Sequence, residues 1–104
     1  MKMIIDAHAH IFPDKVAARA ADGISSFYNL KVRFDGTVDS LLKINEKAGI
    51  DMAVVQSVAT VPEQVHNINS FIAEQVRLHP DKFIGFGALH PDFPDISGET
   101  ERII

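Results

Sequence analysis

The chain has 104 residues, no cysteine and a net charge of −4, from 10 basic and 14 acidic residues. This length suits one small domain, and a hydrophobic content of 46% provides for a core, which argues against wholesale disorder. The lack of a basic run argues against nucleic-acid and membrane partners, and the lack of cysteine excludes disulfides and thiolate metal sites. Because apolar runs fall short of the ~18–20 residues of a membrane span, and Asp6 comes too early for a signal peptide, we expect a cytoplasmic protein.

The first predicted strand, residues 3–10, ends in two histidines. Successive side chains of a strand point to opposite faces, which places the even-numbered residues on one side: Ile4, Asp6, His8 and His10. The Cα atoms of His8 and His10 are then about 6.5–7 Å apart, so both rings can reach one metal ion at about 2.0–2.1 Å. The alternative is a pair of solvent-facing histidines. An apolar strand start, an acid in register and a Phe-Pro stop favour the metal site.

Two neighbours of the histidine pair are further candidates. Asp6 is expected on the same side but deeper, where its carboxylate can accept a hydrogen bond that orients His8. The alternative is an acidic residue whose carboxylate is satisfied by nearby main chain or by a lysine. Phe12 either shapes the substrate pocket or simply packs.

The next segments are a helix and an irregular insert. Residues 14–22 are rich in alanine and predict a helix that Gly23 ends. The insert, at about residues 23–36, shows no clean period. A long connection after such a strand end is either a lid or binding loop, or an irregular packing segment.

Strands and helices then alternate. Thr37 caps a helix that ends at Gly49, and residues 51–58 form an apolar strand typical of a parallel sheet. Residues 60–63 have capping-box spacing, so that a second helix is expected up to Pro80. A third strand is predicted over residues 82–89, and Ser97 begins another helix.

This order predicts a parallel α/β sheet with right-handed crossovers. The strands begin near residues 3, 51 and 82, and the second interval of 31 residues equals the ~31 residues of one strand–helix unit of a barrel. We therefore expect one domain, residues 1–104, made of the first three units of a (β/α)8 barrel and truncated in the third helix. Its inner face would expose four apolar residues and favour self-association: Val54, Val55, Ile84 and Phe86.

Ligands of such sheets bind at the carboxyl ends of the strands. His90 follows the third strand, where it either contacts a substrate or is an exposed loop residue. His66 and His79 lie on a helix and need no functional explanation. The sequence lacks a glycine-rich phosphate loop and a Gly-x-Ser-x-Gly nucleophile motif.

The segment Asp6-Ala7-His8-Ala9-His10-Ile11-Phe12-Pro13 resembles the opening of the amidohydrolase superfamily, in its amidohydrolase 2 branch of metal-dependent (β/α)8-barrel hydrolases and decarboxylases. The similarity extends to residues 56–60 and 85–91. It implies that His8 and His10 ligate a divalent metal, zinc, and that further histidine and aspartate ligands and the acid–base aspartate lie beyond residue 104. The implied function is hydrolysis of a small organic acid, amide or lactone through metal-activated water.

Two alternatives remain open at this point. One is non-oxidative decarboxylation within the same family. The other is a non-catalytic α/β module, either a truncated gene product or an interaction domain, because two protein ligands alone seldom hold zinc tightly. In such a module self-association would supply the missing sheet neighbours.

Overall fold

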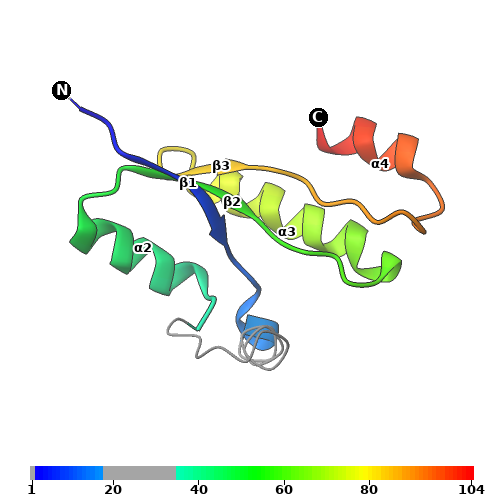
Figure 1. The fold of residues 1–104 in the computed structure, drawn as a ribbon, viewed down its shortest axis with the longest axis horizontal. Helices are drawn as coiled ribbons and strands as arrows, with labels where there is room; N and C mark the ends of the chain where they lie inside the picture. Colours follow the sequence, from blue (N-terminus) through cyan, green and yellow to red (C-terminus); the bar gives the residue numbers. More distant parts are fainter. Residues whose placement is uncertain (1, 18–34) are drawn as a thin grey trace.

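The computed structural model describes residues 2–17 and 35–104. Its three strands form one parallel sheet in the order β1-β2-β3: β1 (Ile5–His10), β2 (Met52–Gln56) and β3 (Phe83–Gly85). The helical elements are α2 (Val38–Ala48), the 3-10 turn η1 (Pro62–Gln64), α3 (Val65–Leu78) and α4 (Ile96–Ile103). The predicted α/β order of strands and helices is confirmed (Figure 1).

Part of the predicted N-terminal region lies outside the described residues. Residues 14–17 are helical, and the remainder of the helix expected up to residue 22 is not among the described residues. Of the insert expected at about residues 23–36, only residues 35 and 36 are described. No helix in the described ranges is long and apolar enough to cross a membrane.

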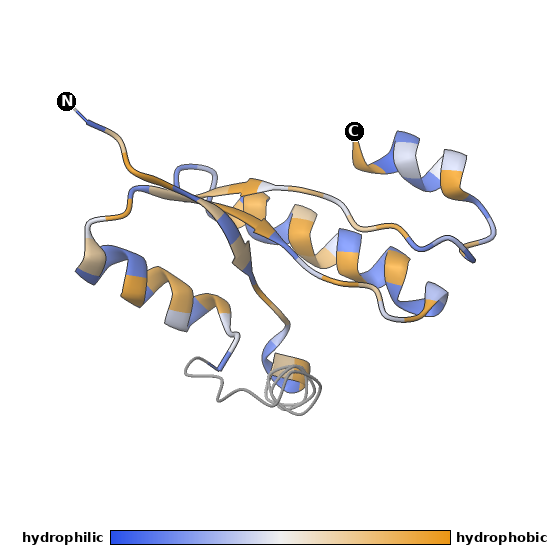
Figure 2. Cartoon of the chain, in the orientation of Figure 1, coloured by the Kyte–Doolittle hydropathy of each residue, from blue (hydrophilic) through white to orange (hydrophobic). Residues whose placement is uncertain are grey.

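Both long helices cover the same face of the sheet. The buried core joins all three strands to α3: Ala9, Ile11, Ala53, Val55, Ile72 and Phe83. The apolar sides of the two helices pack against it through Val38, Leu41, Leu42, Phe71 and Val76. Figure 2 shows the corresponding hydrophobic stretches on the strands and hydrophobic stripes on α2 and α3. The other face of the sheet carries no helix in the described residues.

Helix α2 begins and ends where its capping residues predict. The Thr37 hydroxyl accepts a hydrogen bond from the main-chain N–H of Ser40 at 3.2 Å, and Asp35 in turn accepts from the Thr37 main chain and hydroxyl. Gly49 closes the helix at φ 73°, a left-handed conformation that costs little only for glycine.

The start of α3 differs from the predicted capping box in one residue. The side-chain oxygen of Gln64, rather than that of Glu63, accepts from the Thr60 main chain at 2.8 Å and from the Thr60 hydroxyl at 3.0 Å. The 3-10 turn has Val61 as its N-cap, one residue later than the predicted Thr60, so that Gln64 and not Glu63 occupies the N3 position.

Strand β3 is shorter than the predicted residues 82–89. The Phe86 N–H still donates to the Val55 carbonyl of β2 at 3.0 Å, and beyond it a side chain pairs with the main chain. The amide of buried Asn69 donates to the Ala88 carbonyl at 2.9 Å and accepts from the Ala88 N–H at 2.7 Å. Asn69 also donates to Glu99, which Arg102 pairs, so that α4 is tied to α3 and to this segment.

The prediction that Val55 lies on the open face is wrong. Val55 is fully buried under the helices, because it is level with Gly85, which packs against α3. Its neighbour along the strand, Val54, points to the opposite face. Large apolar side chains that do lie on the face away from the helices are Ile5, Ile84 and Phe86, which are 46%, 39% and 57% exposed.

These exposed residues predict that the 104-residue chain associates with itself. At about 25 cal/mol per Å² of apolar surface, a few hundred Å² left in water costs several kcal/mol, and an exposed sheet edge also recruits other chains. Light scattering at micromolar concentration should therefore give a mass of two or more chains. Phe86→Lys should shift it toward the monomer, whereas Leu78→Lys, at an exposed position on α3, should not. A monomeric wild-type chain would contradict the expectation.

Strand β3 and helix α3 approach so closely that only glycine fits at position 85. A Cβ atom there would lie 2.7 Å from Val76 Cγ2 and 2.8 Å from Ile72 Cγ2. We expect Gly85→Ala to lower the free energy of unfolding by about 1–3 kcal/mol, measured by urea denaturation. In a Val76→Ala background the same change should cost less, since one of the two clashing methyl groups is gone. Equal costs in both backgrounds would rule out this explanation.

Candidate metal centre

His8 and His10 converge at the carboxyl end of β1. Their Nε2 atoms are 3.0 Å apart, and their rings meet edge to face with centroids 4.9 Å apart. The two side chains thus lie on the same side of the strand, as the His-x-His spacing predicts. Since Ala9 and Ile11 point into the helix-covered core, the histidines face the other side of the sheet.

The strand that carries them contains a β-bulge. Asp6 is level with Ala53 of β2, and Ala9 is level with Val55. Three steps along β1 therefore match two steps along β2, which inserts one extra residue between Asp6 and Ala9.

The bulge corrects the predicted face of Asp6. Residues level with each other on neighbouring parallel strands point to the same face, and Ala53 is fully buried under the helices. Asp6 therefore shares the helix-covered face and not that of the histidines. Its carboxylate accepts a hydrogen bond from the main-chain N–H of His8 at 3.1 Å, which matches the main-chain alternative. Simple alternation missed this because it assumes an unbroken strand.

The two imidazoles fit a shared metal ion in geometry and in chemistry. Two nitrogen ligands at about 2.0–2.1 Å from a tetrahedral ion are about 3.3 Å apart, close to the 3.0 Å between the Nε2 atoms. Imidazole is a ligand for several divalent transition metals. Residues 2–17 and 35–104 hold no cluster of three or more His, Asp or Glu side chains that could bind a metal, so the pair stands without a third such ligand in the part of the chain that the structure describes.

His10 is held in an environment that favours its neutral form. Burial lowers the pKa of His10, the neighbouring imidazole of His8 lowers it further, and the main-chain carbonyl of Gln56 raises it. The Nδ1 atom is buried and has no hydrogen bond of normal geometry to a described residue. The ring of Phe12 stacks on His10, with centroids 6.4 Å and planes 10° apart. Neutral imidazole is the form that binds metals.

The remaining predicted site residues are placed differently. His90 lies in the turn before α4, where its Nδ1 accepts from the main-chain N–H of Asp92 at 3.1 Å, and it does not join the histidine pair. Phe12 is half-buried, and its ring lies parallel to that of His10. Substrate contacts of His90 and Phe12 stay predictions.

Gln56 is a neighbour of the pair that the sequence analysis did not single out. It is level with His10 and half-buried, so its side chain shares the open face. The sequence feature that could have identified Gln56 is a polar residue that ends an otherwise apolar strand, at the carboxyl edge of the sheet where ligands bind.

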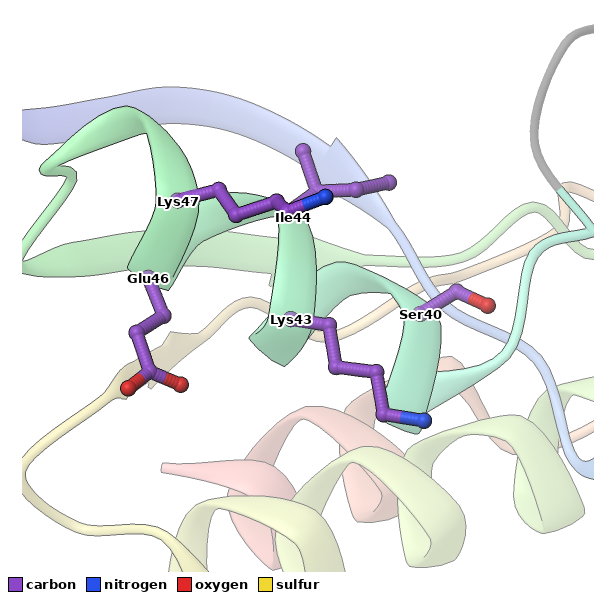
Figure 3. A pocket seen from close by; sticks show the side chains of 5 residues that line it. All are labelled: Ser40, Lys43, Ile44, Glu46 and Lys47. Carbon is purple, nitrogen blue, oxygen red and sulfur yellow. The ribbon is translucent and has the colours of Figure 1, made fainter.

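A hollow elsewhere on the surface is not part of this site. Its volume is about 550 Å³, and it is lined by Ser40, Lys43, Ile44, Glu46 and Lys47 (Figure 3). All five belong to α2, which covers the face of the sheet opposite the histidines.

The lowered pKa of His10 predicts how stability depends on pH. Well above the ordinary pKa of 6.5, His10 is neutral in both the folded and the unfolded chain, and no stability is lost. As the pH falls below 6.5 the unfolded chain takes up the proton more readily, so the free energy of unfolding decreases. Urea midpoints at about pH 7.5 and about pH 5.5 should differ less in His10→Gln than in the wild type. His66→Gln, at an exposed position on α3, is the control, and an unchanged difference in His10→Gln would refute the expectation.

The chain was compared with known proteins. No protein-family model matches it, and no curated protein sequence matches it significantly. Among solved structures, a 2,6-dihydroxybenzoate decarboxylase complexed with 2,6-dihydroxybenzoate covers 98% of this chain at 18% identity, with a TM-score of 0.65. A dihydroxybenzoic acid decarboxylase from Polaromonas sp. JS666, with bound manganese and the inhibitor 2-nitroresorcinol, covers 86% at 22% identity, with a TM-score of 0.59.

The match extends over only part of these structures. The chain spans 36% of the first and 30% of the second, or about a third of their length. At this level of identity the likeness is one of fold. The chain thus has the α/β fold of a partial (β/α)8 barrel, and the histidine pair lies at the carboxyl end of its first strand.

Proposed function

We propose that the chain supplies two metal ligands, His8 and His10, to a metal-dependent decarboxylase of the amidohydrolase type that acts on a small hydroxylated aromatic acid. The observation that carries the proposal is the 3.0 Å approach of the two Nε2 atoms at the carboxyl end of β1. The fold around this pair is similar to that of two dihydroxybenzoate decarboxylases, which favours decarboxylation over the hydrolysis predicted from the sequence.

The proposed metal is a divalent ion. One of the similar structures contains manganese, whereas the zinc expected from the sequence has no support in the comparisons. Two imidazoles do not discriminate strongly between these ions, because geometry and further ligands decide selectivity. A test of the metal site should therefore compare manganese with zinc.

The roles of the residues follow from their positions. A divalent ion at this site would act as a Lewis acid on the oxygens of a bound acid. His8 and His10 would hold the ion through Nε2, and the lowered pKa of His10 keeps its lone pair free of a proton at neutral pH. The flat ring of Phe12, parallel to that of His10, offers one wall to a planar aromatic substrate.

Decarboxylation breaks the bond between the ring carbon and the carboxylate. Carbon dioxide leaves, and a proton takes its place on the ring carbon. Within residues 2–17 and 35–104 no acidic side chain clusters with the histidines to deliver this proton. We therefore propose that the 104-residue chain alone binds metal and substrate, with slow turnover at most.

Titration with Mn²⁺, followed by electron paramagnetic resonance, tests the metal site. We expect His8→Ala and His10→Ala each to weaken Mn²⁺ binding at least about tenfold, since each removes one of two ligands. His66→Ala should bind like the wild type, because His66 is exposed on α3. A parallel titration with Zn²⁺ compares the two ions. Undiminished binding by His8→Ala would contradict the proposal.

Ligand binding in the presence of Mn²⁺ tests the substrate class. We expect 2,6-dihydroxybenzoate to bind only when the metal is present, and resorcinol, which lacks the carboxylate, to bind more weakly. Release of carbon dioxide, however slow, would support decarboxylation. Metal-dependent cleavage of an amide or lactone would instead support hydrolysis, and metal binding without any binding of acids, amides or lactones would favour the non-catalytic module.

A further inference from the structure

We propose that Asp6 positions the metal ligand His8 through the main chain: its carboxylate closes the β-bulge in β1, and it acts as a hydrogen-bond acceptor rather than as a charge. The proposal rests on the proposed metal site for its functional meaning. Its structural part concerns only the bulge and can be tested without any metal.

The first support is the coincidence of the bulge and the hydrogen bond. The extra residue of β1 lies between Asp6 and Ala9, and the carboxylate of Asp6 accepts from the His8 N–H at 3.1 Å within this same stretch. A bulge leaves main-chain groups without their ladder partners, and an unpaired N–H destabilises the local conformation. Asp6 supplies an acceptor for one such group, the N–H of His8.

The second support is the way the strand is anchored on either side. Downstream of the bulge, Ala9 and Ile11 are buried in the core, with Ile11 fully buried. Upstream, Asp6 is level with the fully buried Ala53. Ala7 and His8 lie between these anchors, and the hydrogen bond from the His8 N–H to Asp6 restrains the main chain there.

The third support is the geometry of the proposed metal site. The ring of His8 must reach the ring of His10, which is held by burial and by Phe12. A main chain that rotates at His8 would separate the two Nε2 atoms. The bulge also turns the Asp6 carboxylate to the helix-covered face, away from the histidines, so a direct contact with the metal is not its role.

An acceptor role and a charge role make opposite demands on substitutions. Asp6→Asn removes the charge but keeps an oxygen at the same reach from the His8 N–H. Asp6→Glu keeps the charge but places it one methylene farther away. Asp6→Ala removes both. The proposal predicts that Asp6→Asn behaves like the wild type, and that Asp6→Glu and Asp6→Ala no longer hold the His8 main chain in place.

Hydrogen exchange of the His8 amide, followed by NMR without metal, measures the bulge directly. We expect exchange to be faster by about tenfold in Asp6→Ala and Asp6→Glu, and unchanged in Asp6→Asn. Affinity for Mn²⁺ alone and for Zn²⁺ alone should fall by about tenfold or more in the same two variants. The comparison of Asn with Glu suffices if Asp6→Ala does not fold.

Asp51 offers a matched control. Its carboxylate also accepts from a main-chain N–H of the N-terminal stretch, that of Ile4, at 2.7 Å, but outside the bulge. Asp51→Ala should therefore leave the exchange rate of the His8 amide and the metal affinity unchanged. If Asp51→Ala speeds this exchange and lowers the metal affinity as much as Asp6→Ala does, the effect is a general loosening of the strand and the proposal fails.

The outcomes separate this proposal from the proposed function. Slow exchange at His8 in Asp6→Ala, or impairment in Asp6→Asn equal to that in Asp6→Ala, overturns the role of Asp6. A wild-type chain that binds neither Mn²⁺ nor Zn²⁺, with the predicted exchange pattern intact, overturns the metal site while the bulge closure stands. Normal metal affinity in Asp6→Ala despite fast exchange overturns the positioning role.

Discussion

The structure depends on the burial of one face of a three-stranded sheet. Helices α2 and α3 cover this face, and Ala9 and Ile11 of β1 are buried beneath them. Because side chains alternate along a strand, the burial of these two residues turns His10, which lies between them, to the opposite face. Full burial of an aliphatic side chain such as Ile11 contributes about 1.5–3 kcal/mol, more than a contact between two partly exposed imidazoles. The apolar core, rather than any attraction between the histidines, therefore determines which way they point.

That orientation has an electrostatic consequence for His10. The ring is partly buried between the Phe12 ring and the His8 ring, and this environment disfavours a positive charge. A metal-binding histidine usually donates its second ring nitrogen to an acceptor, which keeps the proton away from the metal side. The Gln56 carbonyl raises the pKa of His10, whereas burial and His8 lower it, and the lowering prevails.

Local patterns predicted most of the fold, and pairing between strands accounts for much of what they missed. The caps of α2, the alternation of strands and helices and the shared side of His8 and His10 are encoded within short stretches, and the structure agrees with them. The face of Asp6 was wrong because a bulge is defined only by register against β2. Val55 was placed on the wrong face because an apolar run, buried on one side and half-buried on the other, carries no alternation to read. The role of Asn69 beside β3 depends on a contact between residues 19 positions apart, and no local pattern signals it.

Asp6 and Asn69 share a physical role at two places where strand pairing is irregular: the bulge within β1 and the segment after the end of β3. An irregular or ended ladder leaves main-chain groups in need of other hydrogen-bond partners. In β1 the Asp6 carboxylate accepts a hydrogen bond from the N–H of His8, and after β3 the Asn69 amide pairs with both main-chain groups of Ala88. Asp6 lies on the strand itself, whereas Asn69 reaches across from α3 and is buried. The choice of residue follows from the need: a lone donor requires only an acceptor, whereas a donor and an acceptor together require an amide. Side chains thus supply hydrogen bonds to main-chain groups where strand pairing is irregular, which allows the bulge of β1 and the segment after β3 to be fixed in position.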